Sequence, residues 1–500
     1  MKSFNRLYNI VISASLMGLA QLPLDLGWLS WFCLVPFFIA IKDRHSLKGI
    51  CIDAFIWGFI YHLISLFWLV DNIGVPNRYI ALTTMLLTNF VCTFNVILIF
   101  IFWHFINKKN SYKVWYALPV VWTVIDFVRS FGSISFPWAS IANTQAQPSL
   151  LFLIQFIEIT GMFGLTIWIV LLNVSLFYIY TNRDKKSVID SIGIFVTPIV
   201  LSVLLINKNI DNIEKIDFAI LQPNMSIYDK NNTKSSRVID DLLKKSKKYI
   251  DEYSSHRILI WPETAFNHFN KNSYNQFKRK LFDSDIELIT GVFEIDNGLI
   301  YNSVYLLNQK NSYVLNNAKK YTKIKMVPLA EHVPMSDFFP SLNRIALSGN
   351  FEIGNEYTLF DYKNSKYAAM ICIESTYSAL SRNFVRKGAN FLIYVANDGW
   401  YLKPPQAQQH AKQTIFRAIE TRKPVIRCGN TGISWVVNSD GNILKELSQN
   451  KEGMLVSSGF DIYSNDLKTI YVIFGDWIGY LSILIAIYLS TVGVVNKRNG

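Results

Sequence analysis

Side chains of catalytic types follow three strongly apolar stretches of this 500-residue sequence. Glu263 ends the run RILIWPE, Cys372 ends AAMIC, and Asn397 and Asp398 follow FLIYVA. Each apolar run is typical of a buried strand, and ligand sites of α/β domains gather at strand ends. A thiol at such a place can act as a nucleophile, provided that a base or a cation favours its thiolate.

The cysteines leave more than one interpretation open for Cys372. It is a free nucleophilic thiol, a small buried residue, or one half of a disulfide with Cys428, which lies in the same polar part of the chain. Cys33, Cys51 and Cys92 lie within or beside long apolar runs, where we expect them to pack as small apolar side chains.

The histidines and glycines form no recognisable cofactor motif. The seven histidines are scattered along the chain, at His45, His62, His104, His256, His268, His332 and His410. None has the spacing of a metal motif such as H-E-x-x-H, and the sequence has no glycine-rich phosphate loop. We therefore expect neither a metal nor an organic cofactor.

Residues 207–468 alternate between apolar and polar runs, which predicts α/β layers. Strands are expected at 216–222, 257–262, 286–295, 301–308, 357–361, 367–373, 389–396 and 424–438. Helices are expected at 233–253, 271–282, 376–387 and 406–422. The stretch 326–356 is long and irregular, and its aromatic residues, including Phe338 and Phe339, favour a lid or binding loop over disorder.

The composition is too apolar for an ordinary soluble enzyme. Hydrophobic residues make up 51% of the chain, charged residues 17%, and the mean hydropathy is +0.22, whereas about a quarter of a typical soluble domain is charged. The apolar excess lies in residues 1–206 and 469–500, while 207–468 hold 34 basic and 27 acidic residues. This division predicts a membrane bundle, a soluble domain and a closing helix, and it excludes a disordered chain or a coiled coil.

Eight apolar stretches approach the roughly 20 residues that a membrane-spanning helix needs. They lie near 8–22, 26–41, 50–70, 79–106, 114–131, 161–181, 188–206 and 469–495. Of the 15 basic residues outside 207–468, 13 fall on one side of these spans, and only Arg78 and Arg129 fall on the other. The positive-inside rule therefore predicts two cytoplasmic termini and an extracytoplasmic domain.

The net charge of +13 does not indicate a nucleic-acid partner. The membrane part contributes +6, mostly as an orientation signal, and the domain contributes +7 over 262 residues. Four acids within spans, Asp53, Asp126, Glu158 and Asp476, are expected at membrane interfaces, with a functional role as the alternative. A transporter is disfavoured because the sequence has no internal repeat.

Ordered motifs in the chain resemble the nitrilase superfamily. They are Trp261-Pro262-Glu263, Tyr321-Thr322-Lys323 through Glu331, Ile371-Cys372-Ile373-Glu374, Asn397-Asp398-Gly399-Trp400, His410 through Glu420, and Arg427 through Gly432. Together with the eight predicted spans and the stretch from Arg129 to Gln145, they make the chain resemble the bacterial apolipoprotein N-acyltransferases, the membrane-embedded members of that superfamily. The resemblance covers most of residues 20–480.

This resemblance implies a four-layer αββα sandwich and a Glu-Lys-Cys triad. The implied enzyme transfers an acyl chain from a membrane phospholipid to Cys372 as a thioester, and then to the α-amino group of an apolipoprotein's N-terminal diacylglyceryl-cysteine, by ping-pong kinetics. Glu263 would be the general base, and Lys323 would stabilise the oxyanion. Supporting and substrate-binding positions would be Glu331, Glu374, Asn397, Trp400 and Asn430. We expect a monomer in the bacterial inner membrane, with the domain in the periplasm.

Three positions depart from the family's pattern. Asn231 stands where a Trp is usual, Ile373 where a Tyr follows the nucleophile, and Asp126 where Glu is commoner. A membrane-tethered amide hydrolase of the same superfamily, with water as acceptor, stays open as an alternative because both reactions pass through a thioester. A non-enzymatic scaffold is disfavoured because all three triad types are present.

Overall fold

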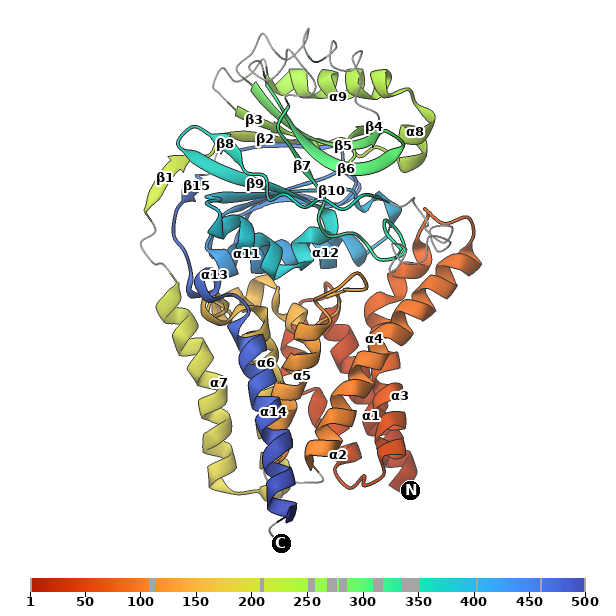
Figure 1. The fold of residues 1–500 in the computed structure, drawn as a ribbon, viewed down its shortest axis with the longest axis vertical. Helices are drawn as coiled ribbons and strands as arrows, with labels where there is room; N and C mark the ends of the chain where they lie inside the picture. Colours follow the sequence, from red (N-terminus) through yellow and green to blue (C-terminus); the bar gives the residue numbers. More distant parts are fainter. Residues whose placement is uncertain are drawn as a thin grey trace. The chain divides into compact units, whose positions relative to one another are not determined.

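The computed structural model describes residues 2–107, 114–206, 211–250, 257–267, 277, 286–308, 318–333, 351–401, 403–458 and 461–498. The chain forms two compact units (Figure 1). The helical unit comprises residues 1–208 and 473–500, and the sheet unit comprises residues 209–472. The expected helix at 271–282, apart from Phe277, and the expected lid around Phe338 and Phe339 lie outside the described residues.

Each of the eight apolar stretches contains helix. The α-helices are α1 (Lys2–Gln21), α2 (Leu34–Ile41), α3 (Leu47–Leu66), α4 (Arg78–Asn107), α5 (Leu118–Val128), α6 (Ile157–Asn182), α7 (Lys185–Leu205), α13 (Ile470–Phe474) and α14 (Trp477–Arg498). Within the described ranges, four helical stretches are long and apolar enough to cross a membrane, at Leu47–Asp71, Arg78–Asn107, Ile157–Asn182 and Lys185–Leu205. Shorter apolar helices cover Gly27–Ile41, Trp115–Val128 and Trp477–Thr491.

Two of the acids in the apolar stretches are paired inside the helical unit. The Asp53 carboxylate lies 2.9 Å from Nε of Arg44 and 3.6 Å from Nε of Arg6. The Asp126 carboxylate lies 3.1 Å from Nε of Arg129. Because an unpaired buried carboxylate is very costly, these ion pairs explain how both acids are accommodated and favour a structural role for them.

The segment 129–160 packs within the helical unit. It forms two 3-10 helices, η4 (Ile141–Gln145) and η5 (Pro148–Leu153). Trp138 is buried with its ring 5.4 Å from that of Trp68, and the Gln145 amide donates to the Gly27 carbonyl and to Ser30 Oγ. The Trp138 ring is therefore part of the packing of the helical unit.

The sheet unit contains two large sheets and a short ribbon. The seven-stranded sheet has the order β14-β2-β3-β5-β6-β7, and β4 pairs with β5. Its strands are β2 (Phe218–Gln222), β3 (Arg257–Ile260), β4 (Phe266–Asn267), β5 (Ile286–Asp296), β6 (Leu299–Leu307), β7 (Lys320–Thr322) and β14 (Gly453–Val456). The ribbon joins β1 (Asn212–Lys215) to β15 (Tyr463–Asn465).

The six-stranded sheet has the order β13-β12-β11-β10-β9-β8. Its strands are β8 (Phe360–Tyr362), β9 (Ser365–Ile371), β10 (Phe391–Ala396), β11 (Val425–Gly429), β12 (Ser434–Val437) and β13 (Ile443–Leu447). The single strand expected at 424–438 is thus two antiparallel strands. Strands β9, β10 and β11 are parallel, as are β2, β3 and β5, so the carboxyl ends of each group meet at one edge of its sheet.

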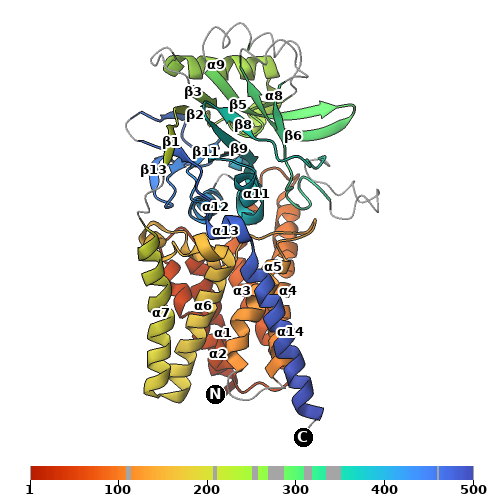
Figure 2. The same cartoon turned by 60° about the vertical axis from the view of Figure 1, so that its left-hand side comes forward.

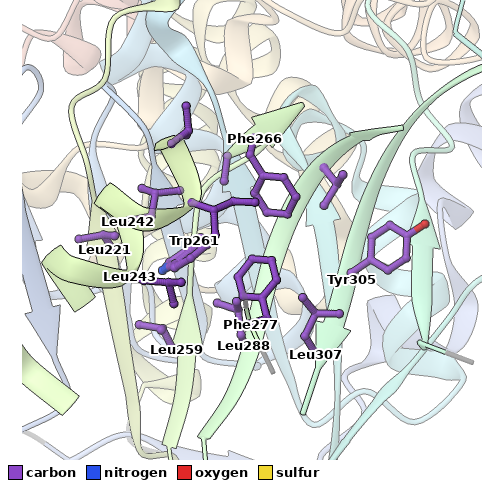
Figure 3. Close-up of a cluster of buried hydrophobic side chains, with 14 of the residues drawn as sticks. Leu221, Leu242, Leu243, Leu259, Trp261, Phe266, Phe277, Leu288, Tyr305 and Leu307 are labelled. Atoms are coloured by element: carbon purple, nitrogen blue, oxygen red, sulfur yellow. The ribbon is translucent and has the colours of Figure 1, made fainter. Parts of the chain in front are cut away.

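Helices cover the outer faces of the two sheets (Figures 1 and 2). Helix α9 (Ser235–Ile250) packs Leu242 and its neighbours onto the seven-stranded sheet, around the buried ring of Trp261 (Figure 3). Helices α11 (Ser378–Arg386) and α12 (Gln406–Thr421) lie on the six-stranded sheet, where Trp435 Nε1 donates to Thr414 Oγ1. The two inner faces meet, since the Cys428 thiol donates to the carbonyls of Leu221 and Ile260.

Candidate active site

Glu263 stands on a tight turn that follows β3. The buried Trp261 anchors the end of this strand, with its indole N–H bound to Ser246 Oγ. The backbone of Gly291 passes so close that a Cβ there would lie 2.6 Å from Cα of Glu263 and 2.6 Å from N of Thr264. Thr264 has a φ of +44°, which is a strained conformation for a β-branched residue. The turn is therefore fixed by packing from both sides.

Both carboxylate oxygens of Glu263 accept hydrogen bonds. Oε1 accepts from Nδ2 of Asn302 at 2.8 Å, and Nζ of Lys323 lies 3.4 Å from the same oxygen. Oε2 accepts from the backbone N–H of Asn397 at 2.8 Å. The side chain is only 5% exposed, so its partners and not water set its orientation. A carboxylate held in this way is ready to accept a proton from a neighbouring group.

Lys323 is completely buried, although the sequence around it is rich in lysine. Lys323 directly follows strand β7, which pairs with β6. The backbone N–H of Lys323 donates to the Asn302 carbonyl. Its ammonium lies 2.6 Å from Oε1 of Glu331. Burial alone lowers the pKa of Lys323, but the carboxylates of Glu331 and Glu263 more than offset this effect and hold the pKa above its ordinary value. Lys323 is therefore a fixed, desolvated cation.

Cys372 follows β9 and begins a 3-10 helix, η8 (Cys372–Thr376). Its φ is +54°, the left-handed region that residues other than glycine rarely adopt, and such strain is of the order of 1–3 kcal/mol and is concentrated at functional sites. Burial and the nearby Glu263 carboxylate raise the pKa of the Cys372 thiol well above its ordinary value, and the Lys323 ammonium lowers it. The resting thiol is thus protonated and must lose its proton to react.

Both cysteines of the sheet unit are free thiols. The disulfide interpretation of Cys372 and Cys428 is therefore wrong. Cys428 lies on β11 and points between the two sheets, where burial raises its pKa well above the ordinary value, so it is a core residue.

Glu374 joins the turn of Cys372 to the loop of Lys323 through hydrogen bonds. One oxygen accepts from Tyr321 Oη at 2.7 Å and from the backbone N–H groups of Ile324 and Lys325, and the other accepts from the N–H of Ile371 at 2.7 Å. The side chain is fully buried, and burial raises its pKa. Its place among these four donors makes it a brace that fixes the segments on which Lys323 and Cys372 stand.

The asparagines expected near the site hold loops together. Asn397 Oδ1 accepts from Nδ2 of Asn430, and Asn430 exchanges two hydrogen bonds with the backbone of Met225. These contacts fix the Asn397 backbone N–H that binds Glu263. Trp400 ends the 3-10 helix η9 (Asp398–Trp400) and is partly exposed. Of the expected supporting residues, Trp400 and Glu331 are partly exposed, whereas Glu374, Asn397 and Asn430 are buried.

A buried charge cluster lies directly behind Asn397. Oδ1 of Asp398 lies 2.6 Å from Nδ1 of His410, and Oδ2 accepts from Nη2 of Arg427 at 2.8 Å. Burial raises the pKa of Asp398, but the Arg427 guanidinium and the contact with His410 more than offset this and hold it well below its ordinary value. All three residues lie in the motifs singled out from the sequence. That they pair with one another could not be predicted, because it depends on how the segment after β10 packs against α12 and β11.

Asn302 was also missed from the sequence. It stands next to Ser303 in the middle of the otherwise apolar strand β6, and a buried polar residue in such a strand is the signal that the sequence offers. No group of three or more His, Cys, Asp or Glu side chains within the described ranges is placed to hold a metal ion. The ionisable groups of the site are the Cys372 thiol, the Lys323 ammonium and the carboxylates of Glu263, Glu331 and Glu374.

Two family domains match the chain in order. The apolipoprotein N-acyltransferase N-terminal domain matches residues 13–175, and the carbon-nitrogen hydrolase domain matches residues 219–458. The apolipoprotein N-acyltransferase of Thermotoga maritima is 29% identical over 496 residues, which cover 96% of this chain and 92% of that protein. The one of Chlorobaculum tepidum is 25% identical, with 94% and 92% covered.

Among solved structures, the crystal structure of Saccharomyces cerevisiae Nit3, a member of branch 10 of the nitrilase superfamily, is 16% identical. It covers 51% of this chain and 92% of its own, with a TM-score of 0.37. The resemblance predicted from the motifs is confirmed: the chain is similar over nearly its whole length to the apolipoprotein N-acyltransferases, and it combines their N-terminal domain with a carbon-nitrogen hydrolase domain.

Proposed function

We propose that this chain transfers an acyl group from a membrane phospholipid to the N-terminal amine of a diacylglyceryl-modified apolipoprotein, through a thioester on Cys372. The observation that carries the proposal is the buried contact between Lys323 and Glu263 beside the strained Cys372 turn. The names of the relatives supply the acceptor. The chemistry of a thiol, a carboxylate and an ammonium supplies the two acyl-transfer steps.

In the loading step, Glu263 takes the proton of the Cys372 thiol. The sulfur then attacks the ester carbonyl carbon of the phospholipid, and the carbonyl oxygen becomes an oxyanion beside the Lys323 ammonium. When the tetrahedral intermediate collapses, the C–O bond breaks and the lysophospholipid alkoxide takes the proton held by Glu263. The thioester remains on the enzyme. The fixed charge of Lys323 stabilises the oxyanion without reorganisation in a site that excludes water.

In the transfer step, the lipoprotein's α-amino group attacks the thioester carbon. Lys323 again lies beside the oxyanion, and Glu263 takes a proton from the attacking nitrogen. Breaking the C–S bond releases an amide product and a thiolate, to which Glu263 returns the proton. The same carboxylate therefore serves both halves of a ping-pong reaction.

The remaining site residues are proposed to support these three groups. Glu331 holds the ammonium of Lys323, and Glu374 braces the two catalytic loops. Asn397 orients Glu263 through its backbone N–H, and Asn430 holds Asn397. Trp400 is proposed to contact substrate because it is partly exposed.

We further propose a monomer in the bacterial inner membrane with eight spans and cytoplasmic termini, and with the domain 207–468 in the periplasm. The distribution of basic residues supports this topology. Both substrates are anchored in a membrane leaflet, so a domain joined to spans at its two ends would meet them without a soluble carrier.

Intact mass spectrometry tests the proposal. The purified protein is incubated in detergent with a phosphatidylethanolamine of one defined acyl chain. A mass gain of one acyl group is expected, which hydroxylamine removes and which is lost in Cys372→Ser. Cys51→Ser, a thiol of the helical unit, is the matched control and should load normally. The proposal fails if the folded protein gains no mass, or if it releases ammonia from a small amide in place of loading acyl chains.

A further inference from the structure

A second buried lysine lies behind the turn of Glu263. Lys230 stands on the short helix α8 (Ile227–Asn232), which begins at the Ser226 cap. It is 8% exposed, whereas lysines are rarely buried so fully unless they are paired. Its Nζ donates to the carbonyl oxygen of Thr264 at 2.7 Å and to Thr264 Oγ1 at 2.9 Å. The mechanism described above does not use this lysine.

The residue that Lys230 holds is the strained one next to the base. Thr264 adopts a φ of +44°, and its Oγ1 also accepts from Nδ2 of Asn397. The next N–H, of Ala265, donates to the Gly291 carbonyl. Because a β-branched residue does not stay in this conformation unaided, the two contacts from Lys230 are part of what keeps the Glu263 turn in place.

Lys230 also changes the charge balance around Glu263. Burial lowers the pKa of Lys230 to about 8, and the Glu263 carboxylate opposes that shift. The Lys323 ammonium lies 3.4 Å from the Glu263 carboxylate and 2.6 Å from that of Glu331. The Asp398 carboxylate, which also acts on the Cys372 thiol, is paired with Arg427. Without Lys230, the carboxylates of Glu263 and Glu331 would share one ammonium.

We propose that Lys230 is a positioning residue for Glu263: it clamps the Glu263–Thr264 turn and supplies a positive charge that favours the base in its ionised form. This inference rests on the proposed role of Glu263 as the base that takes the Cys372 proton. Lys230 itself touches neither the thiol nor an acyl group in this scheme. It acts through the turn and through its field.

The pH profile of Cys372 reactivity tests the proposal. Single-turnover acyl loading is measured by intact mass from pH 5 to 9 in the full-length protein and in Lys230→Met, Lys230→Arg and Lys234→Met. Lys234 is an exposed lysine four residues away and serves as the control. In Lys230→Met we expect loading at neutral pH to fall about 10- to 100-fold, since a misplaced base is that costly. The acidic limb of its pH–rate profile should move to higher pH, since loss of a nearby positive charge disfavours an ionised carboxylate.

Lys230→Arg keeps the positive charge. The acidic limb of its pH–rate profile should therefore return to the position seen in the original protein, even if its loading rate stays lower. A purely structural role predicts the opposite: a lower rate and lower thermal stability in Lys230→Met with an unmoved limb. That result, or Lys230→Met loading with the original profile, would overturn the inference.

A second readout separates this inference from the proposed function. Iodoacetamide alkylates Cys372 without any lipid, and peptide mass spectrometry measures its rate against pH. If the original protein takes no acyl chain yet Lys230→Met moves the alkylation profile to higher pH, the positioning role stands and the acyltransferase proposal fails. If acyl loading works and neither profile moves, the positioning role fails alone.

Discussion

Gly291 leaves just enough room for the backbone of the turn at Glu263, and replacing it with alanine should displace Glu263. A Cβ at this position would lie 2.6 Å from Cα of Glu263, 2.6 Å from N of Thr264 and 2.7 Å from O of Pro262. All three atoms belong to the backbone, so no side-chain rotation can relieve the contact. Ordinary contact begins at 3.4 Å, so the turn must retreat by about 0.8 Å.

A displacement of this size is sufficient to disable Glu263 as the proposed base. Glu263 would move away from Asn302 and Asn397, whose hydrogen bonds to it are 2.8 Å long. A misplacement of ~1 Å at a catalytic group costs about 100-fold in rate, so Gly291→Ala should load acyl chains about 100-fold more slowly. Overpacking of this kind also destabilises a fold by about 1–3 kcal/mol.

Gly453→Ala is the matched control for that variant. Gly453 lies in the same sheet, on β14, and a Cβ there would meet the methyl carbons of Leu447 at 3.2 and 3.6 Å, which can move. Single-turnover loading by intact mass and thermal unfolding are measured for both variants. Gly453→Ala should load normally. If Gly291→Ala also loads normally, or if both variants lose loading and stability together, the close approach of β5 does not position Glu263.

Two further substitutions test the charges of the site. Lys323→Met should reduce the rate of acyl loading by about 100- to 1,000-fold, as does loss of an oxyanion donor in other enzymes. Because Lys323 lowers the pKa of the Cys372 thiol, alkylation of Cys372 in this variant should also require higher pH. Lys319→Met removes a solvent-facing ion pair and is the control; it should change neither the loading rate nor the alkylation profile. Asp398→Asn leaves Arg427 and His410 without their carboxylate and should destabilise the sheet unit by about 3–5 kcal/mol in thermal or denaturant unfolding at neutral pH. Since the pKa of Asp398 in the folded protein is depressed, ionised Asp398 stabilises the fold above about pH 4, and this contribution is lost as pH falls. The difference in free energy of unfolding between the original protein and Asp398→Asn should therefore narrow in acid. A difference that does not change with pH would contradict the depressed pKa of Asp398.

Much of the sheet unit was predictable because its strands are fully buried apolar runs. FLIYVA forms β10 with every residue buried, and AAMIC supplies the end of β9 followed by Cys372. Glu263 and Cys372 could be selected from the sequence because each follows such a run directly. The short edge strands β1, β13 and β15 were missed because their mixed polar composition gives no burial signal.

Lys323 shows why local composition is a poor guide to the site. Lys319, Lys320 and Lys325 surround it, a pattern that is typical of a solvated face. In the fold, Lys319 and Lys320 reach surface carboxylates, whereas Lys323 turns inward to Glu331. The difference depends on the pairing of β7 with β6 and on a carboxylate eight residues later, and neither is visible in a window of neighbouring residues.

The charges of the site also explain why its thiol is protonated at rest. A thiolate formed by loss of a proton to water would be a third anion beside Glu263 and Glu331, and the pKa of Cys372 is raised by burial and by the first of these carboxylates. In the proposed mechanism, transfer of that proton to Glu263 keeps the number of anions constant, because one carboxylate is neutralised as the thiolate forms. The barrier to nucleophilic attack then depends on how closely Glu263 is held to the sulfur. Residues that only position this carboxylate, such as Gly291 and Asn397, should therefore affect the rate nearly as strongly as those that react.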